Sequence, residues 1–161
     1  MMSDKKLVIY SDGASRGNPG PAGIGIVICD ERGEVVKEYG EFIGTATNNI
    51  AEYRALIKGL ELASNFPISE VECFSDSELM IKQLKGDYAV KNPRLHELFL
   101  QVREKERHFG RVSYVHVSRE DACIARADEL ANRAIEKKDQ KANRLSLKRL
   151  GTTLLTGCTG L

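Results

Sequence analysis

The chain has 161 residues, of which 42% are hydrophobic and 29% are charged. This balance is typical of one globular domain and excludes a disordered or a membrane-embedded chain. Its 24 basic and 23 acidic residues nearly cancel, so the total charge does not indicate a polyanionic partner. The four cysteines have no metal-finger spacing, and the apolar run near the N-terminus is only four residues long. We therefore expect a cytoplasmic protein that does not associate with a membrane.

The charge is unevenly distributed along the chain. Residues 137–149 contain six basic residues and one acidic residue, whereas the remainder has 18 basic and 22 acidic residues, a net charge of −4. Such a basic segment is either a solvated terminus or an electrostatic handle for nucleic acid.

Three antiparallel strands are predicted first. Residues 7–11 form a short apolar strand that ends at the Gly- and Pro-rich segment 12–21. Residues 22–29 are almost all apolar or glycine, as in a central strand covered on both faces. A turn at 30–33 then leads to a third strand over 35–43.

Helical periodicity begins after the third strand. The remaining predictions, in chain order, are a helix over 49–65, a strand over 71–75, a short helix over 77–85, a helix from Pro93 to about 108, a strand over 111–118 and a helix over 125–138. The order β-β-β-α-β-α-α-β-α predicts an α/β fold with one five-stranded mixed sheet flanked by helices. We expect residues 1–138 to form a catalytic domain and 139–161 a tail of unknown role.

Four acidic residues lie where predicted elements begin or end: Asp12, Glu52, Asp76 and Asp128. If the fourth strand pairs parallel to the first, Asp12 and Asp76 occupy neighbouring carboxyl ends of the sheet. The other two acids can reach the same rim from their helices. Carboxylates gathered in this way need divalent metal to offset their repulsion. Metal held by carboxylates, with room for phosphate oxygens, is typical of two-metal phosphodiester chemistry.

Each acid also has an ordinary local explanation. Asp12 suits a turn, and Asp76 suits the N-cap of the next helix. Glu52 fits a capping box that starts at Asn49, and Asp128 suits the first turn of the last helix. The joint pattern of the four acids favours a shared site.

Four segments, each with one of these acids, resemble ribonuclease H of type 1: Y-S-D-G-A-S-R-G-N-P-G-P-A-G, T-N-N-I-A-E-Y, F-S-D-S-E-L and A-R-A-D-E-L-A-N. The resemblance extends from residue 7 to about 135 and is to the short form without a basic protrusion. It implies a ribonuclease H-like fold and an enzyme that cleaves the RNA strand of RNA/DNA hybrids. It further implies two Mg²⁺ ions, with Mn²⁺ as a substitute, held by the four carboxylates, and products with 5′-phosphate and 3′-hydroxyl ends. No obligate protein partner is implied.

The resemblance also implies a set of hybrid contacts, namely Gly13, Ser15, Asn18, Thr47, Asn48, Asn49, Tyr88 and Asn92. Some of these positions have simpler explanations. Asn18 fits a turn, and Tyr88 fits an ordinary exposed position. Asn48, Asn49 and Asn92 each fit a helix cap.

The sequence departs from the family in two places. Thr45 stands where many relatives have a phosphate-binding arginine, and the loop before the last helix reads H-V-S-R-E-D-A-C-I-A-R-A-D instead of H-V-P-R-E-x-N-x-x-A-D. In the family this loop supplies a histidine, or an arginine in its place, that assists proton transfer. His116 fits this catalytic role by motif and Arg119 by charge, while His116 also fits a plain strand end.

Two other functions are compatible with the resemblance. The altered loop is compatible with a catalytically impaired module that binds RNA/DNA hybrid or double-stranded RNA. An integrase-like or reverse-transcriptase-associated relative is the third reading, disfavoured by the short chain and short N-terminus.

Overall fold

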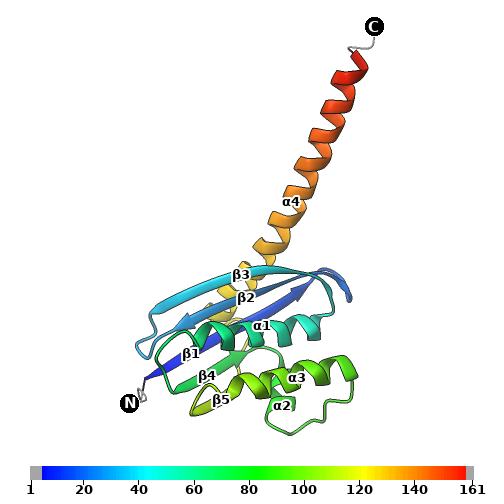
Figure 1. Cartoon of the computed structure of the whole chain (residues 1–161). Helices are drawn as coiled ribbons and strands as arrows, with labels where there is room; N and C mark the ends of the chain where they lie inside the picture. Colours follow the sequence, from blue (N-terminus) through cyan, green and yellow to red (C-terminus); the bar gives the residue numbers. More distant parts are fainter. Residues whose placement is uncertain (1–4, 159–161) are drawn as a thin grey trace.

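Five strands form one mixed sheet in the order β3-β2-β1-β4-β5 (Figure 1). The computed structural model describes residues 5–158, with side-chain surroundings given up to residue 150. The elements are β1 (Lys6–Ser15), β2 (Gly20–Cys29), β3 (Val35–Ala46), α1 (Asn48–Ala63), β4 (Glu70–Ser75), α2 (Glu78–Leu84), α3 (Pro93–Glu106), β5 (Arg111–His116) and α4 (Ala122–Cys158). The predicted fold class and order of elements are confirmed.

The sheet is antiparallel on one side and parallel on the other. β2 pairs antiparallel with both β1 and β3, and β4 pairs parallel with both β1 and β5. The β2–β3 turn is closed by the carboxylate of Asp30, which accepts the backbone N–H groups of Arg32 and Glu34. Gly33 in this turn has φ +84°, a conformation that favours glycine.

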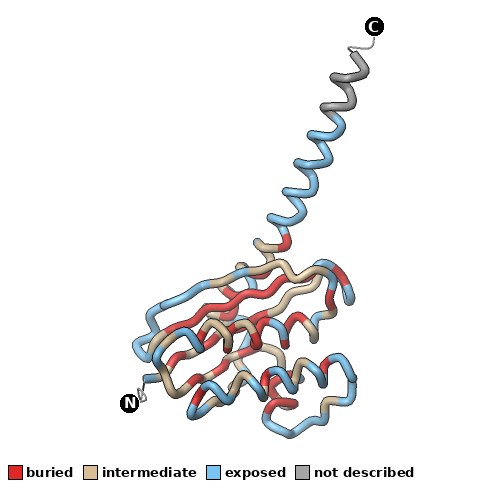
Figure 2. The backbone as a smooth tube through the Cα atoms, viewed as in Figure 1, coloured by how far each residue is buried: buried red, intermediate tan, exposed pale blue. Residues whose placement is uncertain are grey.

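Helices cover both faces of the sheet. The main core joins Ile9, Ile26 and Cys73 of the sheet to α1, α2 and α3, and it includes the fully buried Leu56 and Leu60. On the other face, α4 packs on a smaller cluster that includes Val27 and Cys29. The tube view shows the resulting buried layer between the helices and the exposed outer edges (Figure 2). Among the residues described, no helix is both long and apolar enough to cross a bilayer.

β1 is longer than predicted. The strand was expected to end at residue 11, but its pairing with β2 continues to Ser15, opposite Ala22. The glycine-rich segment therefore begins as strand, because its backbone groups still have partners in β2. Asp12 lies within the strand, opposite Gly25, and the prediction that it opens a turn is wrong.

α4 differs most from the prediction. It was expected over 125–138, but it runs from Ala122 to Cys158. Its start is earlier because the Asp121 carboxylate accepts the N–H groups of Cys123 and Ile124. It projects well beyond the sheet (Figure 1), and its residues 136–150 are all exposed (Figure 2). The helix thus crosses residue 138, and a boundary between catalytic domain and tail at this position stays a prediction.

Candidate active site

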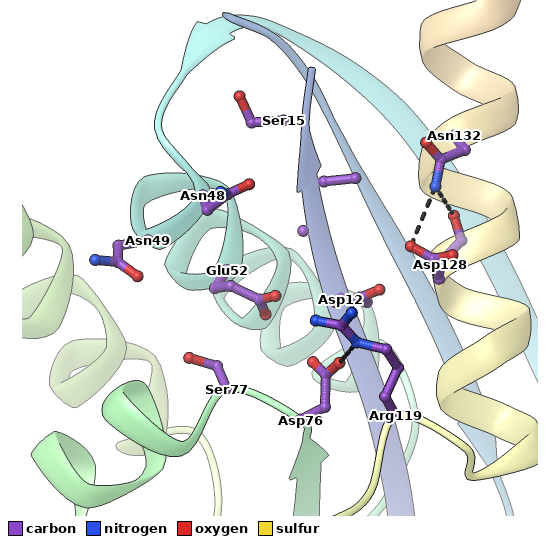
Figure 3. Close-up of a pocket in the computed structure, with 12 residues that line it drawn as sticks. Asp12, Ser15, Asn48, Asn49, Glu52, Asp76, Ser77, Arg119, Asp128 and Asn132 are labelled. Carbon is purple, nitrogen blue, oxygen red and sulfur yellow. Dashed lines mark hydrogen bonds and ion pairs between the residues drawn. The ribbon is translucent and has the colours of Figure 1, made fainter. Parts of the chain in front are cut away.

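Three carboxylates meet at one rim of the sheet. Asp12, Glu52 and Asp76 each offer an oxygen, and these oxygens all lie within 4.8 Å of one another. Asp12 and Glu52 are buried, and the Asp76 side chain is 13% exposed. The residues come from β1, α1 and the connection between β4 and α2 (Figure 3). The predicted convergence of these three acids is therefore seen in the structure.

Strand register brings Asp12 and Asp76 together. The parallel pairing of β1 and β4 ends with Tyr10 opposite Phe74. Asp12 and Asp76 each lie two residues further along, so both side chains leave their strands at the same level of the sheet. This is the carboxyl edge of the parallel strands, where α/β sheets place their sites.

Close packing of α1 on β1 brings Glu52 to the same point. A Cβ atom added to Gly13 would overlap the backbone of Ala51 and would lie 2.5 Å from the Glu52 nitrogen. Only a residue without a side chain allows this approach. α1 therefore crosses β1 immediately beside Asp12, and Glu52 points at it.

The capping roles considered for two of these acids are wrong. Ser77, not Asp76, caps α2, because its Oγ accepts the Met80 N–H at 3.3 Å. Thr47 caps α1 and accepts the Ile50 N–H at 3.3 Å, so Glu52 is not in the capping-box position. Neither carboxylate is used by the helix next to it, and both remain available to the cluster.

The cluster is electrostatically unfavourable without a cation. Burial, followed by the negative charge of Glu52, raises the pKa of Asp12 well above its ordinary value. Burial also raises the pKa of Glu52. Glu52 Oε2 is buried and has no hydrogen-bond partner among the described residues. Closely spaced carboxylate oxygens, one of them unsatisfied, are the donor set that Mg²⁺ and Mn²⁺ prefer, so these residues fit a divalent metal.

Asp128 faces the same pocket from α4, opposite the residues of α1 (Figure 3). It is exposed and lies in the second turn of α4, not in the first turn as expected. Its carboxylate is held by Asn132, whose Nδ2 donates to Asp128 Oδ1 at 3.1 Å and to the Asp128 carbonyl at 3.0 Å. Asn132 was not singled out from the sequence, although its spacing of four residues from Asp128 on a helix was a usable signal.

The acids line an open pocket of about 450 Å³. Four of the residues predicted to contact a hybrid lie in its wall: Gly13, Ser15, Asn48 and Asn49. Their backbone, hydroxyl and amide groups surround the carboxylates with neutral hydrogen-bonding groups. The pocket is therefore acidic at its base and polar at its sides. The remaining wall residues are Ala14, Ser77, Arg119 and Asn132.

The other predicted contacts lie outside the pocket wall. Asn18 Oδ1 accepts the Asn48 N–H at 3.1 Å, so it fixes the start of α1. Asn92 caps α3 by accepting the N–H groups of Arg94 and Leu95. Tyr88 is 49% exposed, with Lys82 Nζ 3.3 Å from its hydroxyl. Contacts of Asn18, Thr47, Tyr88 and Asn92 with a hybrid stay predictions.

Arg119 and His116 have different positions relative to the pocket. Arg119 is among the pocket residues, and its Nε lies 3.5 Å from Asp76 Oδ2 (Figure 3). Its side chain is 90% exposed. His116 ends β5 opposite Ser75, is exposed, and is not among the residues that line the pocket. The position of Arg119 is the better one for assisting proton transfer, and the role of either residue stays a prediction.

Known proteins are similar to this chain in fold and in sequence. The model of a family described as "Reverse transcriptase-like" matches residues 10–134. "Ribonuclease HI" of Halobacterium salinarum is 46% identical over 127 residues, which cover 79% of this chain. The N-terminal RNase H domain of rv2228c from Mycobacterium tuberculosis has a TM-score of 0.80 and 42% identity, covering 86% of this chain and 99% of that one. LC11-RNase H1, solved in complex with RNA/DNA hybrid, has a TM-score of 0.76 and 45% identity, covering 82% of this chain and 98% of that one.

The five-stranded mixed sheet with its flanking helices is thus shared with solved RNase H1 structures. The chain belongs to the ribonuclease H family, type 1. It spans 63% of the length of the Halobacterium protein and 37% of the full Mycobacterium tuberculosis protein, which is named "Bifunctional protein Rv2228c".

Proposed function

We propose that this chain is a metal-dependent endoribonuclease that hydrolyses the RNA strand of RNA/DNA hybrids. The convergence of Asp12, Glu52 and Asp76 on an open polar pocket carries this proposal. The hybrid as substrate is supported by LC11-RNase H1, a relative of similar length that was solved with RNA/DNA hybrid. The expected products carry 5′-phosphate and 3′-hydroxyl ends.

Two Mg²⁺ ions, or Mn²⁺ in their place, would be held by the four acids when the substrate is bound. Asp12, Glu52 and Asp76 would supply the main ligands, and the exposed Asp128 would complete the coordination more loosely. Bound divalent cations supply Lewis-acid activation of water near neutral pH and stabilise charge on the departing 3′ oxygen.

The residues around the acids then orient the substrate. Burial of Asp12 and Glu52 keeps these carboxylates in fixed positions, which avoids reorganisation during the reaction. Gly13 lines the pocket next to Asp12, where a nucleic-acid strand can approach its backbone. Asn48 and Asn49 present amide groups at the side of the pocket, where they can read the groove and the 2′-hydroxyls that distinguish RNA from DNA.

A cleavage assay with three labelled duplexes tests the proposal. RNA/DNA hybrid, double-stranded RNA and double-stranded DNA are each incubated with Mg²⁺, Mn²⁺ or EDTA. We expect cleavage of the hybrid alone, in its RNA strand, with either metal and not with EDTA. The Asp12→Asn variant serves as the inactive control. Tight hybrid binding without cleavage in either metal would instead support an impaired binding module.

The cytoplasm remains the proposed location. Cys29, Cys73 and Cys123 are free thiols, and Cys29 and Cys73 are buried as small core residues. Free thiols are typical of proteins that work in a reducing compartment.

A further inference from the structure

Beyond Asp139, α4 leaves the sheet, and no other element covers its residues up to 150. The last described contacts with the sheet region are the ion pairs of Arg16 with Glu136 at 3.2 Å and with Asp139 at 3.5 Å, and Lys138 above the ring of Phe42 at 5.8 Å. Residues 139–150 are all exposed. From Asp139 the helix continues to Cys158, a further length of about 28 Å.

Three cations lie along one side of this segment. Lys137, Lys141 and Arg144 follow the spacing i, i+4, i+7, which places one on each helical turn along a single face. We refer to these three residues as the basic stripe. All three are exposed, and residues 140–150 contain no acidic residue that could offset them within the segment.

The basic stripe is unfavourable for the helix that carries it. Like charges three and four residues apart on a helix repel and destabilise it. A helix with little tertiary packing is also only marginally stable in water. A polyanion bound along the stripe would remove the repulsion and hold the helix, so the charge pattern favours an anionic occupant.

The apolar residues nearby do not suit a membrane surface. Leu147 and Leu150, 67% and 59% exposed, lie on one side of the stripe, and Leu145, 50% exposed, lies on the other, as the helical angle of 100° per residue dictates. The polar side chain of Asn143 lies between those of Leu147 and Leu150 around the helix and interrupts the apolar surface. A helix that lies on a membrane needs one continuous apolar face beside its cations. A regular row of phosphates, as in a nucleic-acid backbone, requires only the cations.

The basic stripe points away from the pocket. Lys137 lies nine positions after Asp128 on α4, which is about two and a half turns. The two side chains therefore leave opposite sides of the helix. A duplex seated at Asp12 and Asp128 would therefore not lie along the stripe. The stripe is a separate surface about 14 Å or more along the helix from the pocket.

We propose that the basic stripe is a second nucleic-acid site, which binds the sugar-phosphate backbone of a duplex independently of sequence and outside the catalytic pocket. The choice of nucleic acid as occupant rests in part on the proposed hybrid substrate. Such a site would anchor the enzyme on long nucleic acid while the pocket acts on a nearby segment.

Binding of duplex DNA in EDTA tests the stripe without any cleavage. The variant is K137Q/K141Q/R144Q, and the matched control is R32Q/K37Q/R107Q, which removes three exposed cations far from the stripe. Affinity is measured between about 50 and 200 mM salt, because each lost phosphate contact lowers the slope of log K against log salt by about 0.9. We expect a slope lower by about 2.7 in the stripe variant and little change in the control.

Cleavage of a short hybrid, of about ten base pairs, reports on the fold and on the pocket. We expect both variants to cut it at the wild-type rate. Suppose that the wild type and both variants fail to cut any hybrid, while only the stripe variant loses DNA affinity. This result would support the second site and would contradict the proposed ribonuclease activity. Equal slopes in wild type, stripe variant and control overturn the second site. Stripe-dependent binding to phosphatidylglycerol vesicles with unchanged DNA binding overturns it as well.

Discussion

Gly13 lies against the backbone of Glu52 so closely that a Cβ atom on Gly13 would be 2.5 Å from the Glu52 nitrogen. Replacing Gly13 with alanine must therefore push α1 away from β1 and move Glu52 from Asp12. We expect Gly13→Ala to destabilise the protein by about 1 to 3 kcal/mol through overpacking. A displacement of the order of 1 Å in the site should lower hybrid cleavage about 100-fold. Urea unfolding and initial cleavage rates measure the two effects.

Gly33→Ala is the matched control for this substitution. Gly33 has φ +84° and nothing within 4 Å of an added Cβ, so alanine there costs about 1 to 2 kcal/mol in backbone strain alone. The β2–β3 turn lies away from the pocket, so this variant should lose stability but keep its cleavage rate. Equal loss of activity in both variants would show that lost stability, and not displacement of Glu52, explains the Gly13→Ala result.

The clustered carboxylates should lower the free energy of unfolding at neutral pH. The pKa values of Asp12 and Glu52 are raised in the folded protein, so the folded state holds protons that the unfolded state releases above about pH 4. In metal-free solution the stability should fall as the pH rises from 4 towards the raised folded values. We expect Asp12→Asn, which removes one charge, to be more stable than wild type at pH 8 by at least about 1.4 kcal/mol, the equivalent of one pKa unit. The difference should shrink at pH 5.

Added Mg²⁺ should make the wild type more stable than Asp12→Asn at pH 8. Mg²⁺ binds deprotonated carboxylates, so it should stabilise the wild type more at pH 8 than at pH 5 and should not stabilise Asp12→Asn. Thermal unfolding with Mg²⁺ or EDTA at the two pH values provides the comparison. A wild type that is more stable than Asp12→Asn at pH 8 in EDTA would contradict the account of the cluster.

We expect Asn132 to affect metal binding indirectly, by positioning the carboxylate of Asp128. Its amide holds the exposed carboxylate by the hydrogen bond of 3.1 Å to Oδ1, and loss of such a supporting contact typically weakens metal binding 10- to 100-fold. We expect Asn132→Ala to raise the Mg²⁺ concentration required for half-maximal cleavage by about tenfold, with a smaller effect at saturating Mg²⁺. Arg133→Ala on the same helix, whose side chain instead pairs with Glu129, should leave the Mg²⁺ dependence unchanged.

Substitutions can show whether Arg119 or His116 assists proton transfer. Arg119 lies at the pocket beside Asp76, so Arg119→Ala should lower kcat by about 100-fold if its side chain assists proton transfer, and Arg119→Lys should recover part of the loss. His116→Ala should have a smaller effect, because His116 is not among the pocket residues. A larger loss in His116→Ala would assign the role to the histidine, as the family motif suggests.

The fold could be predicted from the sequence where patterns are local. Alternating and continuous apolar runs predicted all five strands, and helical spacing from Ile50 to Ala63 predicted α1. The ends were less accurate because they depend on partners. β1 continues through Asp12 since β2 still pairs with it, and no property of D-G-A-S shows that. α4 begins early at a cap from Asp121 and extends over a segment in which Gly and Thr suggested no helix.

The acidic residues of the site could be predicted from the sequence, but the positions of the residues around them could not. Asp12 and Asp76 follow from strand order, because parallel pairing of β1 and β4 places their ends together. Glu52 follows from its place near the start of the helix that connects β3 to β4. Asn132 was missed because its role depends on a single rotamer that faces Asp128. The relative positions of Arg119 and His116 depend on the path of an irregular loop, which periodicity does not describe.

Metal binding by the three carboxylates is the claim on which the proposed function depends. Crystals of the wild-type protein soaked in Mn²⁺ test it directly by anomalous diffraction. We expect at least one strong peak within about 2.5 Å of oxygens from Asp12, Glu52 and Asp76, and no such peak in crystals of Asp12→Asn. Peaks only at other positions, or none at all under conditions in which a hybrid is cleaved, would contradict it.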